Sequence, residues 1–290
     1  MKIDSPLIIN ACLTGMVPTK RDNPWVPVSP EEIAADAAAC AAAGASIFHL
    51  HARDENGVPT YKAEVYSRIL TKVREACPDA ILCVSTSGRN FKTFEQRSEV
   101  LDIDGPARPE MASLTLGSLN FPKQASVNEP EMISRLAMRM RERGIVPELE
   151  VFDMGMLDYG KFLIDRKILS GPHYVNLLLG SLGTLSATPL HLALLVNALP
   201  AGTTWAAAGI GRFQFAMNSL AIVTGGHVRV GLEDNLFLDE AKQRSARNVD
   251  LIRRLVNLAQ AAERPIASPA QARQIIGLTE ASPAEMFLHH

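Results

Sequence analysis

The stretch Ile47–Asp54 reads IFHLHARD and follows directly on the alanine-rich run Ile33–Ala45. An apolar start followed by polar residues predicts a short strand that ends in functional groups. Side chains alternate between the two faces of a strand, so His49 and His51 share one face, about 6–7 Å apart along the backbone. Two imidazoles so placed can converge on one metal ion or can hydrogen-bond within a polar core, and this pattern alone leaves both open.

The composition is that of a globular protein with a large core, because 47% of the 290 residues are hydrophobic and 21% are charged. This length suits one large barrel or two ordinary domains. The net charge of −2 argues against a nucleic-acid-binding surface. The four cysteines form no C-x-x-C pair and the chain shows no secretory leader, so we expect reduced thiols in a cytoplasmic protein.

The segment Val175–Leu199 is apolar enough to resemble a membrane span. Asn176, Pro189 and His191 interrupt it, and glycine and serine residues gather in its middle. A strand, a tight turn and a helix therefore explain the segment better than a continuous span, and we expect no membrane partner.

Outward from the histidine stretch, apolar β-rich runs alternate with helical patterns. The predicted strands are Leu7–Leu13, Ser46–Ala52, Ile81–Ser87, Met111–Leu116, Val146–Phe152, Tyr174–Leu179, Thr204–Ile210 and His227–Leu232. Eight strands alternating with helices predict an α/β fold with a parallel sheet, and this length favours one (β/α)8 TIM-barrel domain over residues 1–290. A doubly wound sheet is the alternative, but Gly209–Gly211 is only a fragment of a dinucleotide fingerprint.

Helix start signals support the alternation. Ser29 and Pro30 open a helix that ends at Gly44, and Asp239–Ala262 has the pattern of a long amphipathic helix. Ser268 and Pro269 cap an extra C-terminal helix. These last two helices carry more apolar residues than one barrel face needs, which favours a homo-oligomer.

Polar residues end nearly every predicted strand, and in a TIM barrel these ends form the rim of the active site. A catalytic zinc ion takes three protein ligands, so His49 and His51 need a third. Glu233 follows the last strand, which neighbours the first strand once the barrel closes. The other interpretation of Glu233 and Asp234 is an acid pair at a helix N-terminus. Asp234 is also a candidate general base, and Arg229 either binds a carboxylate bidentately or forms an ion pair at the strand end.

Two further strand ends carry polar groups. The segment Ser85–Gly88 is rich in hydroxyl groups, and its glycine allows close backbone approach, so neutral donors there can hold a carboxylate. No Gly-x-Ser-x-Gly elbow surrounds these serines, which excludes a serine nucleophile of that type. Glu148 and Glu150 share a strand face, where they either position a polar group or neutralise a nearby arginine.

Together these segments resemble the β-keto acid cleavage enzyme family, whose type member is the 3-keto-5-aminohexanoate cleavage enzyme of lysine fermentation. The resemblance extends roughly from Leu7 to Leu278. The matching segments are Asn10–Gly15, Gly44–Asp54, Val84–Gly88, Ala112–Phe121, Pro147–Asp153 and Gly226–Asn235. The resemblance implies a TIM barrel, one zinc ion per subunit and a homotetramer.

The family's functional residues map onto matching positions of this chain. His49, His51 and Glu233 match the zinc ligands. The residues expected to be catalytic are Arg229, Asp234 and Ser85. Those expected to bind substrate are Ser85, Gly88, Thr115 and Glu148.

The implied reaction condenses a 3-oxo acid with acetyl-CoA and cleaves the adduct to acetoacetate and an acyl-CoA. Two alternatives stay open: a zinc-dependent aldolase or hydrolase that does not use CoA, and a non-catalytic barrel that binds a metal or an acyl-CoA. An open His₂Glu site with a separate aspartate and arginine beside it argues against the non-catalytic barrel.

The loop after the first strand departs from the family pattern. Members that act on an amine-bearing substrate place an acid there, whereas this chain has Lys20 and Arg21. Two cations at the mouth predict a preference for neutral or anionic 3-oxo acids. The alternatives are that both side chains face solvent or that one contacts the CoA phosphates. His289 and His290 are left out of the site.

Overall fold

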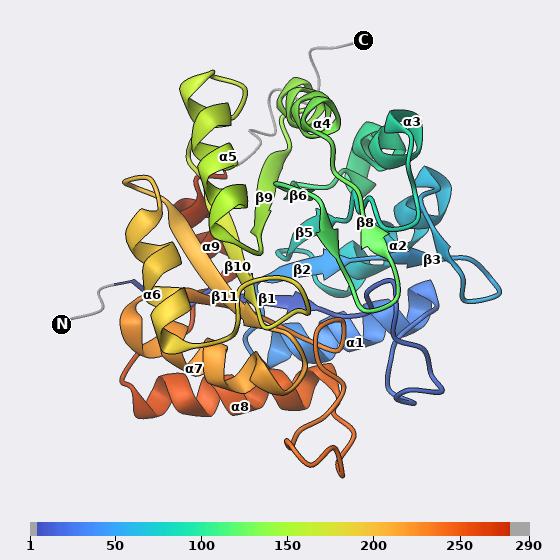
Figure 1. Ribbon diagram of the computed structural model, residues 1–290. Helices are drawn as coiled ribbons and strands as arrows, with labels where there is room; N and C mark the ends of the chain where they lie inside the picture. The colour runs from blue at the N-terminus through green and yellow to red at the C-terminus, as the bar shows by residue number, and fades with distance from the viewer. Residues whose placement is uncertain (1–4, 279–290) are drawn as a thin grey trace.

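The alternation of strands and helices closes into a parallel barrel (Figure 1). The computed structural model describes residues 5–278. The barrel strands are β1 (Ile9–Cys12), β2 (Ile47–Leu50), β5 (Ile81–Val84), β6 (Met111–Thr115), β9 (Val146–Val151), β10 (Tyr174–Leu179), β11 (Thr204–Gly209) and β12 (His227–Val230). Each lies inside its predicted range, and β12 pairs with β1, so the predicted (β/α)8 TIM barrel is confirmed. His289 and His290 lie outside the described residues.

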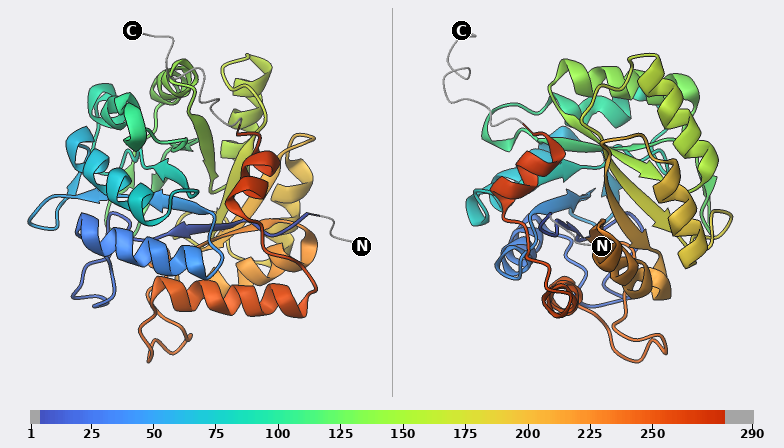
Figure 2. Two further views of the ribbon diagram at one scale, coloured as in Figure 1. Left: turned by 180° about the vertical axis from the view of Figure 1, so that it is seen from behind. Right: turned by 90° about the vertical axis from the view of Figure 1, so that its left-hand side faces the viewer.

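An outer ring of helices covers the barrel (Figures 1 and 2). These are α1 (Pro30–Ala42), α2 (Ala63–Ala76), α3 (Phe94–Ser98), α4 (Pro130–Glu142), α5 (Met154–Asp165), α6 (Pro189–Ala198), α7 (Gln214–Thr224) and α8 (Asn248–Ala261). The start of α1 follows from its sequence, because Ser29 and Glu32 form a reciprocal capping box around Pro30. The apolar segment 175–199 becomes β10, a turn and α6, as predicted, and within residues 5–278 no helix has the length and apolar run to cross a bilayer.

The prediction of one long helix over Asp239–Ala262 is wrong at its start. The helix α8 begins at Asn248, and the residues before it form a loop. The Asp239 carboxylate accepts hydrogen bonds from the backbone N–H groups of Gln243 and Arg244. Such local side-chain bonds compete with helical hydrogen bonds, which keeps this segment out of the helix.

Helix α9 (Pro269–Ile276) is the predicted extra C-terminal helix, and it covers the N-terminal end of the barrel. Seen from behind in Figure 2, it lies across the strands. Ala272 and Ile276 of α9 pack with Ile8, Ile47 and Tyr174 in a small buried cluster at this end. The bottom of the barrel is therefore closed by apolar side chains.

Two short antiparallel hairpins stand at the opposite end, and the sequence pattern did not predict them. One consists of β3 (Ala52–Arg53) and β4 (Pro59–Thr60), and the other of β7 (Leu119–Asn120) and β8 (Ala125–Ser126). They follow the C-terminal ends of β2 and β6, so their loops build walls around the mouth of the barrel.

Candidate active site

A cavity of about 550 Å³ opens at the C-terminal ends of the barrel strands. Its polar floor comes from strand ends and the residues that follow them, namely His49, His51, Ser85, Thr115, Glu150, Arg229, Glu233 and Asp234. Loop residues, among them Met16, Val17, Arg89, Phe121 and Lys123, complete its walls. The predicted rim is thus confirmed in part, since these strand ends line one cavity at the place where TIM-barrel active sites lie.

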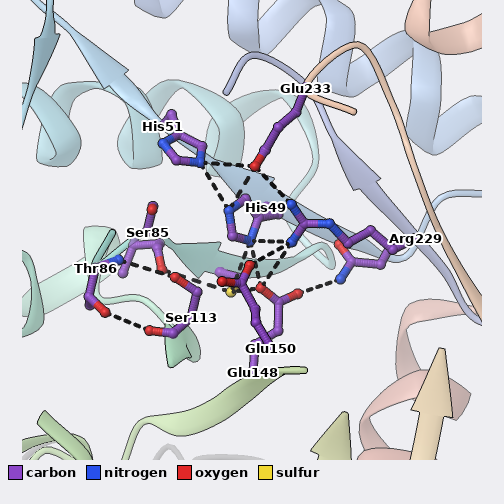
Figure 3. A network of polar contacts seen from close by, with 12 residues as sticks. His49, His51, Ser85, Thr86, Ser113, Glu148, Glu150, Arg229 and Glu233 are labelled. Atoms are coloured by element: carbon purple, nitrogen blue, oxygen red, sulfur yellow. Dashed lines mark hydrogen bonds and ion pairs between the residues drawn. The ribbon is translucent and has the colours of Figure 1, made fainter. Parts of the chain in front are cut away.

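Three predicted metal ligands converge on one point of this floor (Figure 3). The Nε2 atoms of His49 and His51 are 3.2 Å apart. Glu233 Oε1 lies 3.3 Å from Nε2 of His51, and Glu233 Oε2 lies 3.7 Å from Nε2 of His49. The sequence prediction that these three residues come together is therefore confirmed.

Close packing of β1 against the end of β12 makes this convergence possible. Cys12 pairs with His49 on one side, and its carbonyl accepts a hydrogen bond from the backbone N–H of Glu233 on the other. A Cβ atom on Gly231 would lie 2.0 Å from the carbonyl oxygen of Cys12. Only glycine therefore allows the segment after β12 to approach β1 this closely.

The three residues fit a divalent cation. Glu233 Oε2 is buried and has no hydrogen-bond partner among residues 5–278. Nδ1 of His49 lies 2.6 Å from Oε2 of Glu148, an interaction that fixes the ring and leaves Nε2 to face His51. Two imidazole nitrogens and a carboxylate oxygen are the donor set of many catalytic zinc sites.

A second group of donors, His49 with Cys83 and Glu148, lies below the floor and fits an ion less well. All three are buried, and burial together with Glu148 raises the pKa of the Cys83 thiol well above its usual range. The protonated thiol donates a hydrogen bond to Oε2 of Glu148 at 3.4 Å. These contacts make the group a support for the His49 ring.

The electrostatics of the two histidines differ, although both rings are buried. Burial alone would lower the pKa of His49, but the carboxylates of Glu148 and Glu233 outweigh it and raise that pKa to about 9. For His51 burial dominates and the pKa is lowered. Glu148 is held ionised, because His49 and Arg229 lower its pKa to about 2 against the effect of burial. Negative charge thus accumulates around a site suited to a cation.

Arg229 is buried in the floor of the cavity, and each of its three guanidinium nitrogens donates to a carboxylate of the protein. Its Nε donates to Asp234 at 3.1 Å, Nη1 to Glu150 at 3.1 Å and Nη2 to Glu233 at 2.8 Å. The ion-pair interpretation of Arg229 is therefore confirmed, and bidentate binding of a substrate carboxylate stays a prediction. Burial raises the pKa of Asp234 to about 6, although Arg229 opposes the shift.

Glu148 and Glu150 lie at different depths of the barrel. Both point inward from β9, but Glu148 is completely buried below His49, whereas Glu150 lines the cavity. Its burial argues against the prediction that Glu148 contacts substrate. Its side chain faces His49, Arg229 and the amide of Asn10, so it acts on the site through His49.

The hydroxyl-rich end of β5 divides between the cavity and the barrel wall. Ser85 and Ser87 line the cavity, whereas Thr86 donates a hydrogen bond to the carbonyl of Ser113 at 2.6 Å on the neighbouring strand (Figure 3). Gly88 does not reach the cavity wall. A Cβ atom there would lie 2.5 Å from the carbonyl oxygen of Val127, so tight packing explains the glycine.

Thr115, predicted from β6, does line the cavity. Its hydroxyl donates to Oε2 of Glu150 at 2.6 Å. The hydroxyl oxygen keeps lone pairs, and the carboxylate it contacts is also held by Arg229. Thr115 therefore belongs to the same polar network as Arg229.

Lys20 and Arg21 are exposed and do not line the cavity. Lys20 pairs with Glu32 at the start of α1. The same loop instead presents Met16 and Val17 to the cavity, and Arg53 holds it through hydrogen bonds to the carbonyls of Gly15 and Pro18. The expectation that two cations overhang the substrate is wrong, because the loop turns them outward.

The sequence prediction missed several cavity residues, among them Arg89 and Phe121. Arg89 comes directly after the Ser85–Gly88 segment, and Phe121 lies in the hairpin after β6. The centre of the Arg89 guanidinium lies 3.6 Å from the centroid of the Phe121 ring. Their place just beyond strand ends was a signal, but the hairpin that brings them together was not predicted.

Comparison with known proteins identifies relatives over nearly the whole chain. The family model described as beta-keto acid cleavage enzyme matches residues 6–278. Two proteins named 3-keto-5-aminohexanoate cleavage enzyme are similar: that of Acetoanaerobium sticklandii is 38% identical over 94% of this chain and 99% of its own length, and that of Fusobacterium nucleatum is 41% identical over 94% and 98%. The 3-oxoadipate:acetyl-CoA acetyltransferase of Cupriavidus necator is 35% identical over 94% and 95%.

Solved structures share the fold. The apo structure of ObcA aligns with a TM-score of 0.78 and 22% identity, over 88% of this chain and 66% of that protein. At this level of identity the likeness concerns the barrel architecture alone.

Proposed function

The chain belongs to the beta-keto acid cleavage enzyme family, and from that premise we propose that it uses a divalent cation to exchange the acyl group of a 3-oxo acid with acetyl-CoA. It is an acyltransferase that cleaves a carbon–carbon bond. The 3-oxo acid R–CO–CH₂–COO⁻ and acetyl-CoA give R–CO–S-CoA and acetoacetate. The bond between C2 and C3 of the acid breaks, a bond from C2 to the acetyl carbonyl carbon forms, and the CoA sulfur moves to the former C3.

The observation that carries the proposal is the convergence of His49, His51 and Glu233 at the floor of the cavity. Among the described residues, Oε2 of Glu233 has no hydrogen-bond partner there. These residues would hold the cation, and their donor set favours zinc. When bound, the ion supplies Lewis-acid polarisation of the ketone and carboxylate oxygens of the substrate.

Asp234 is the proposed base that takes a proton from C2 and later returns it to acetoacetate. It lines the cavity, and the hydrogen bond from Nε of Arg229 orients its carboxylate. The same arginine holds Glu233 and Glu150, so it aligns the base with the cation site. A base placed within reach of the reacting carbon contributes about 100- to 10,000-fold to the rate.

Ser85 and Thr115 are the proposed donors for the carboxylate at C1. Both line the cavity, and a hydroxyl group can rotate to present its proton, which for Thr115 means turning away from Glu150. Neutral donors hold this carboxylate without adding a positive charge, which would lower the pKa of Asp234 and make it a weaker base.

A labelling experiment tests the proposal. The metal-loaded enzyme is incubated with acetyl-CoA labelled with ¹³C in the acetyl group and with each of several 3-oxo acids. We expect label at C3 and C4 of acetoacetate and one acyl-CoA formed per acetyl-CoA consumed. Consumption of the 3-oxo acid without acetyl-CoA would instead indicate an aldolase or hydrolase, and binding without turnover would indicate the non-catalytic barrel.

We also propose a homo-oligomer, expected to be a tetramer, in a cytoplasm that keeps the four free cysteines reduced. The apolar residues of α8 do not support this as the sequence suggested, since they pack on the barrel. Support comes from α6 and α7, where Leu190, Leu194 and Val223 are 66%, 48% and 50% exposed.

Light scattering should show an oligomer at micromolar concentration, and the double variant Leu190→Asp with Leu194→Asp should dissociate it. A wild-type monomer would contradict the proposal.

A further inference from the structure

Arg89 is a cavity residue whose guanidinium has no polar partner in the part of the chain that the structure describes. It lines the cavity, yet it forms no hydrogen bond through its side chain and no ion pair with any residue between 5 and 278. Its Nε is buried without a partner. Arg229, by contrast, directs its three nitrogens at carboxylates of the protein. An unpartnered arginine on a cavity wall has donors available for a ligand.

The side chain of Arg89 is nevertheless fixed in place. Its guanidinium stacks on the Phe121 ring, with 3.6 Å between the guanidinium carbon and the ring centroid. Stacking on an aromatic face restricts the guanidinium without using its N–H donors. The arginine is therefore preorganised to form bidentate hydrogen bonds with a planar anion such as a carboxylate.

The charges around Arg89 do not neutralise it by contact. Burial lowers its pKa, and the more distant carboxylates of Glu233, Glu150 and Asp234 oppose that shift. Those three carboxylates already hydrogen-bond to Arg229. A half-buried cation without a contacting anion is unfavourable, so an anionic ligand group would be bound preferentially.

The position of Arg89 in the barrel indicates which part of a ligand it meets. Ser85, just after the end of β5, and the cation ligands lie on the floor, and Arg89 follows Ser85 by four residues, beside a hairpin of the mouth. A 3-oxo acid with C1 and the ketone at the floor therefore extends its tail, from C4 onward, toward Arg89. The facing loop offers apolar Met16 and Val17 rather than an acid that would attract an ammonium group.

On the basis of the proposed function, we propose that Arg89 binds the second carboxylate of a dicarboxylic 3-oxo acid and makes such acids the preferred substrates. CoA matches this position less well, since the pantetheine arm is uncharged near the thioester and its phosphates lie at the far end of the arm. Arg89 is in this view a specificity-determining residue that contacts the substrate tail.

The test compares two acids of six carbons that differ only at the tail, 3-oxoadipate and 3-oxohexanoate. Wild type should show a kcat/KM about 10- to 100-fold higher for 3-oxoadipate, the range for a charge-assisted bond at a desolvated site. Arg89→Met should remove that preference, change 3-oxohexanoate turnover less than about threefold and leave the KM for acetyl-CoA unchanged. Arg89→Lys should retain part of the preference.

Two control variants separate charge from packing. Arg135→Met removes an arginine that also stacks on an aromatic ring, that of Phe94 at 4.0 Å, but lies outside the cavity wall. Arg21→Met removes an exposed cation of the loop after β1 that does not line the cavity. Neither should alter the preference between the two acids.

Three results would overturn the inference. An equal loss for both acids in Arg89→Met would place Arg89 at the C1 carboxylate, and a raised KM for acetyl-CoA would place it at CoA. A wild-type enzyme that prefers 3-oxohexanoate would exclude an anion site. Failure of the proposed function gives a different result from failure of this inference, because no acetoacetate would then form from either acid. Calorimetric binding of 3-oxoadipate without acetyl-CoA, to wild type and Arg89→Met, would still decide whether Arg89 binds the anion.

Discussion

The two ends of the barrel are built from the same strands but treat buried polar groups in opposite ways. At the C-terminal end, Arg229 and Glu148 are buried as charged groups within a network of ion pairs. At the N-terminal end, Ile8, Ile47 and Tyr174 pack with α9 in an apolar cluster. One end holds charge where a substrate enters, and the other closes the core, which is the usual division between function and stability in TIM barrels.

Two histidines show this difference most directly. His49 at the mouth sits between carboxylates, which raise its pKa to about 9. His227, at the start of β12, accepts a hydrogen bond from the backbone N–H of Ile8 at 3.0 Å, and burial lowers its pKa to about 3, helped by Arg264. The same side chain thus serves as a member of a charged cluster at one end and as a neutral acceptor at the other.

The largest expected effect on activity comes from replacing His49, and replacing His227 is the matched comparison. His49→Ala should abolish stoichiometric metal binding and lower kcat/KM by about 1,000-fold or more, because it removes one of three ligands. The matched variant His227→Ala should keep the metal and the activity but lose about 1–3 kcal/mol of stability, since it leaves the Ile8 N–H unsatisfied. Elemental analysis, kinetics and urea unfolding measure the three quantities. Full metal content in His49→Ala would refute the ligand assignment.

A smaller loss of activity is expected for Asp234→Asn. This variant keeps the shape of the side chain and a group that can accept from Nε of Arg229, but it cannot take a proton. We expect kcat to fall about 100- to 10,000-fold while the metal content and the KM change little. If kcat is unchanged, Asp234 does not act as the base, and Glu150 becomes the next carboxylate of the floor to test.

The sequence predicted the barrel because each strand is an apolar run bounded by turn residues, and each observed strand lies inside its predicted range. The sequence also predicted that Glu233 lies near His49, because barrel closure makes the last strand a neighbour of the first. It did not separate Glu148 from Glu150, because residues two apart on a strand share a face and only the register decides their depth.

The contacts of arginine side chains were the least predictable part of the site. Arg229 meets carboxylates from both β9 and its own strand end, and these pairings depend on barrel closure. The place of Lys20 and Arg21 in a loop after a strand predicted that they overhang the mouth, with solvent exposure as an alternative. The direction of the loop, set by hydrogen bonds from Arg53, turned them outward.

The pH dependence of stability should expose the neutral histidine at the closed end. His227 has a folded pKa of about 3, below the unfolded value of about 6.5, so its contribution is complete above pH 6.5 and is lost as the pH falls toward 3. The free energy of unfolding should therefore fall by about 1 kcal/mol per pH unit more in wild type than in His227→Gln. Urea unfolding at pH 7.5 and 5 measures this difference, and parallel pH profiles would contradict it.

The smallest expected effect concerns Asp36, a carboxylate outside the barrel. It contacts Asn248, which in turn binds the backbone beside the C-terminal ends of β1 and β12. Asn248 donates a hydrogen bond to Oδ2 of Asp36 at 2.6 Å and another to the carbonyl of Leu13, and its Oδ1 accepts from the N–H of Leu232. Burial raises the pKa of Asp36 to about 6, above the unfolded value of about 3.9. Folding therefore favours its protonated form, and stability is lost as the pH rises from 4 through 6, the opposite sign to His227.

Replacing Asp36 with asparagine should remove this penalty while keeping an oxygen that accepts from Asn248. Because Asp36 is partly exposed, we expect the variant to gain only about 1 kcal/mol at pH 7.5 and nothing at pH 4. Its kcat/KM should stay within about twofold of wild type, since the backbone groups of Leu13 and Leu232 remain bound to Asn248. A stability gain accompanied by a large loss of kcat would contradict this expectation. It would show that the charge of Asp36, outside the barrel, helps to position the strand ends beside Glu233.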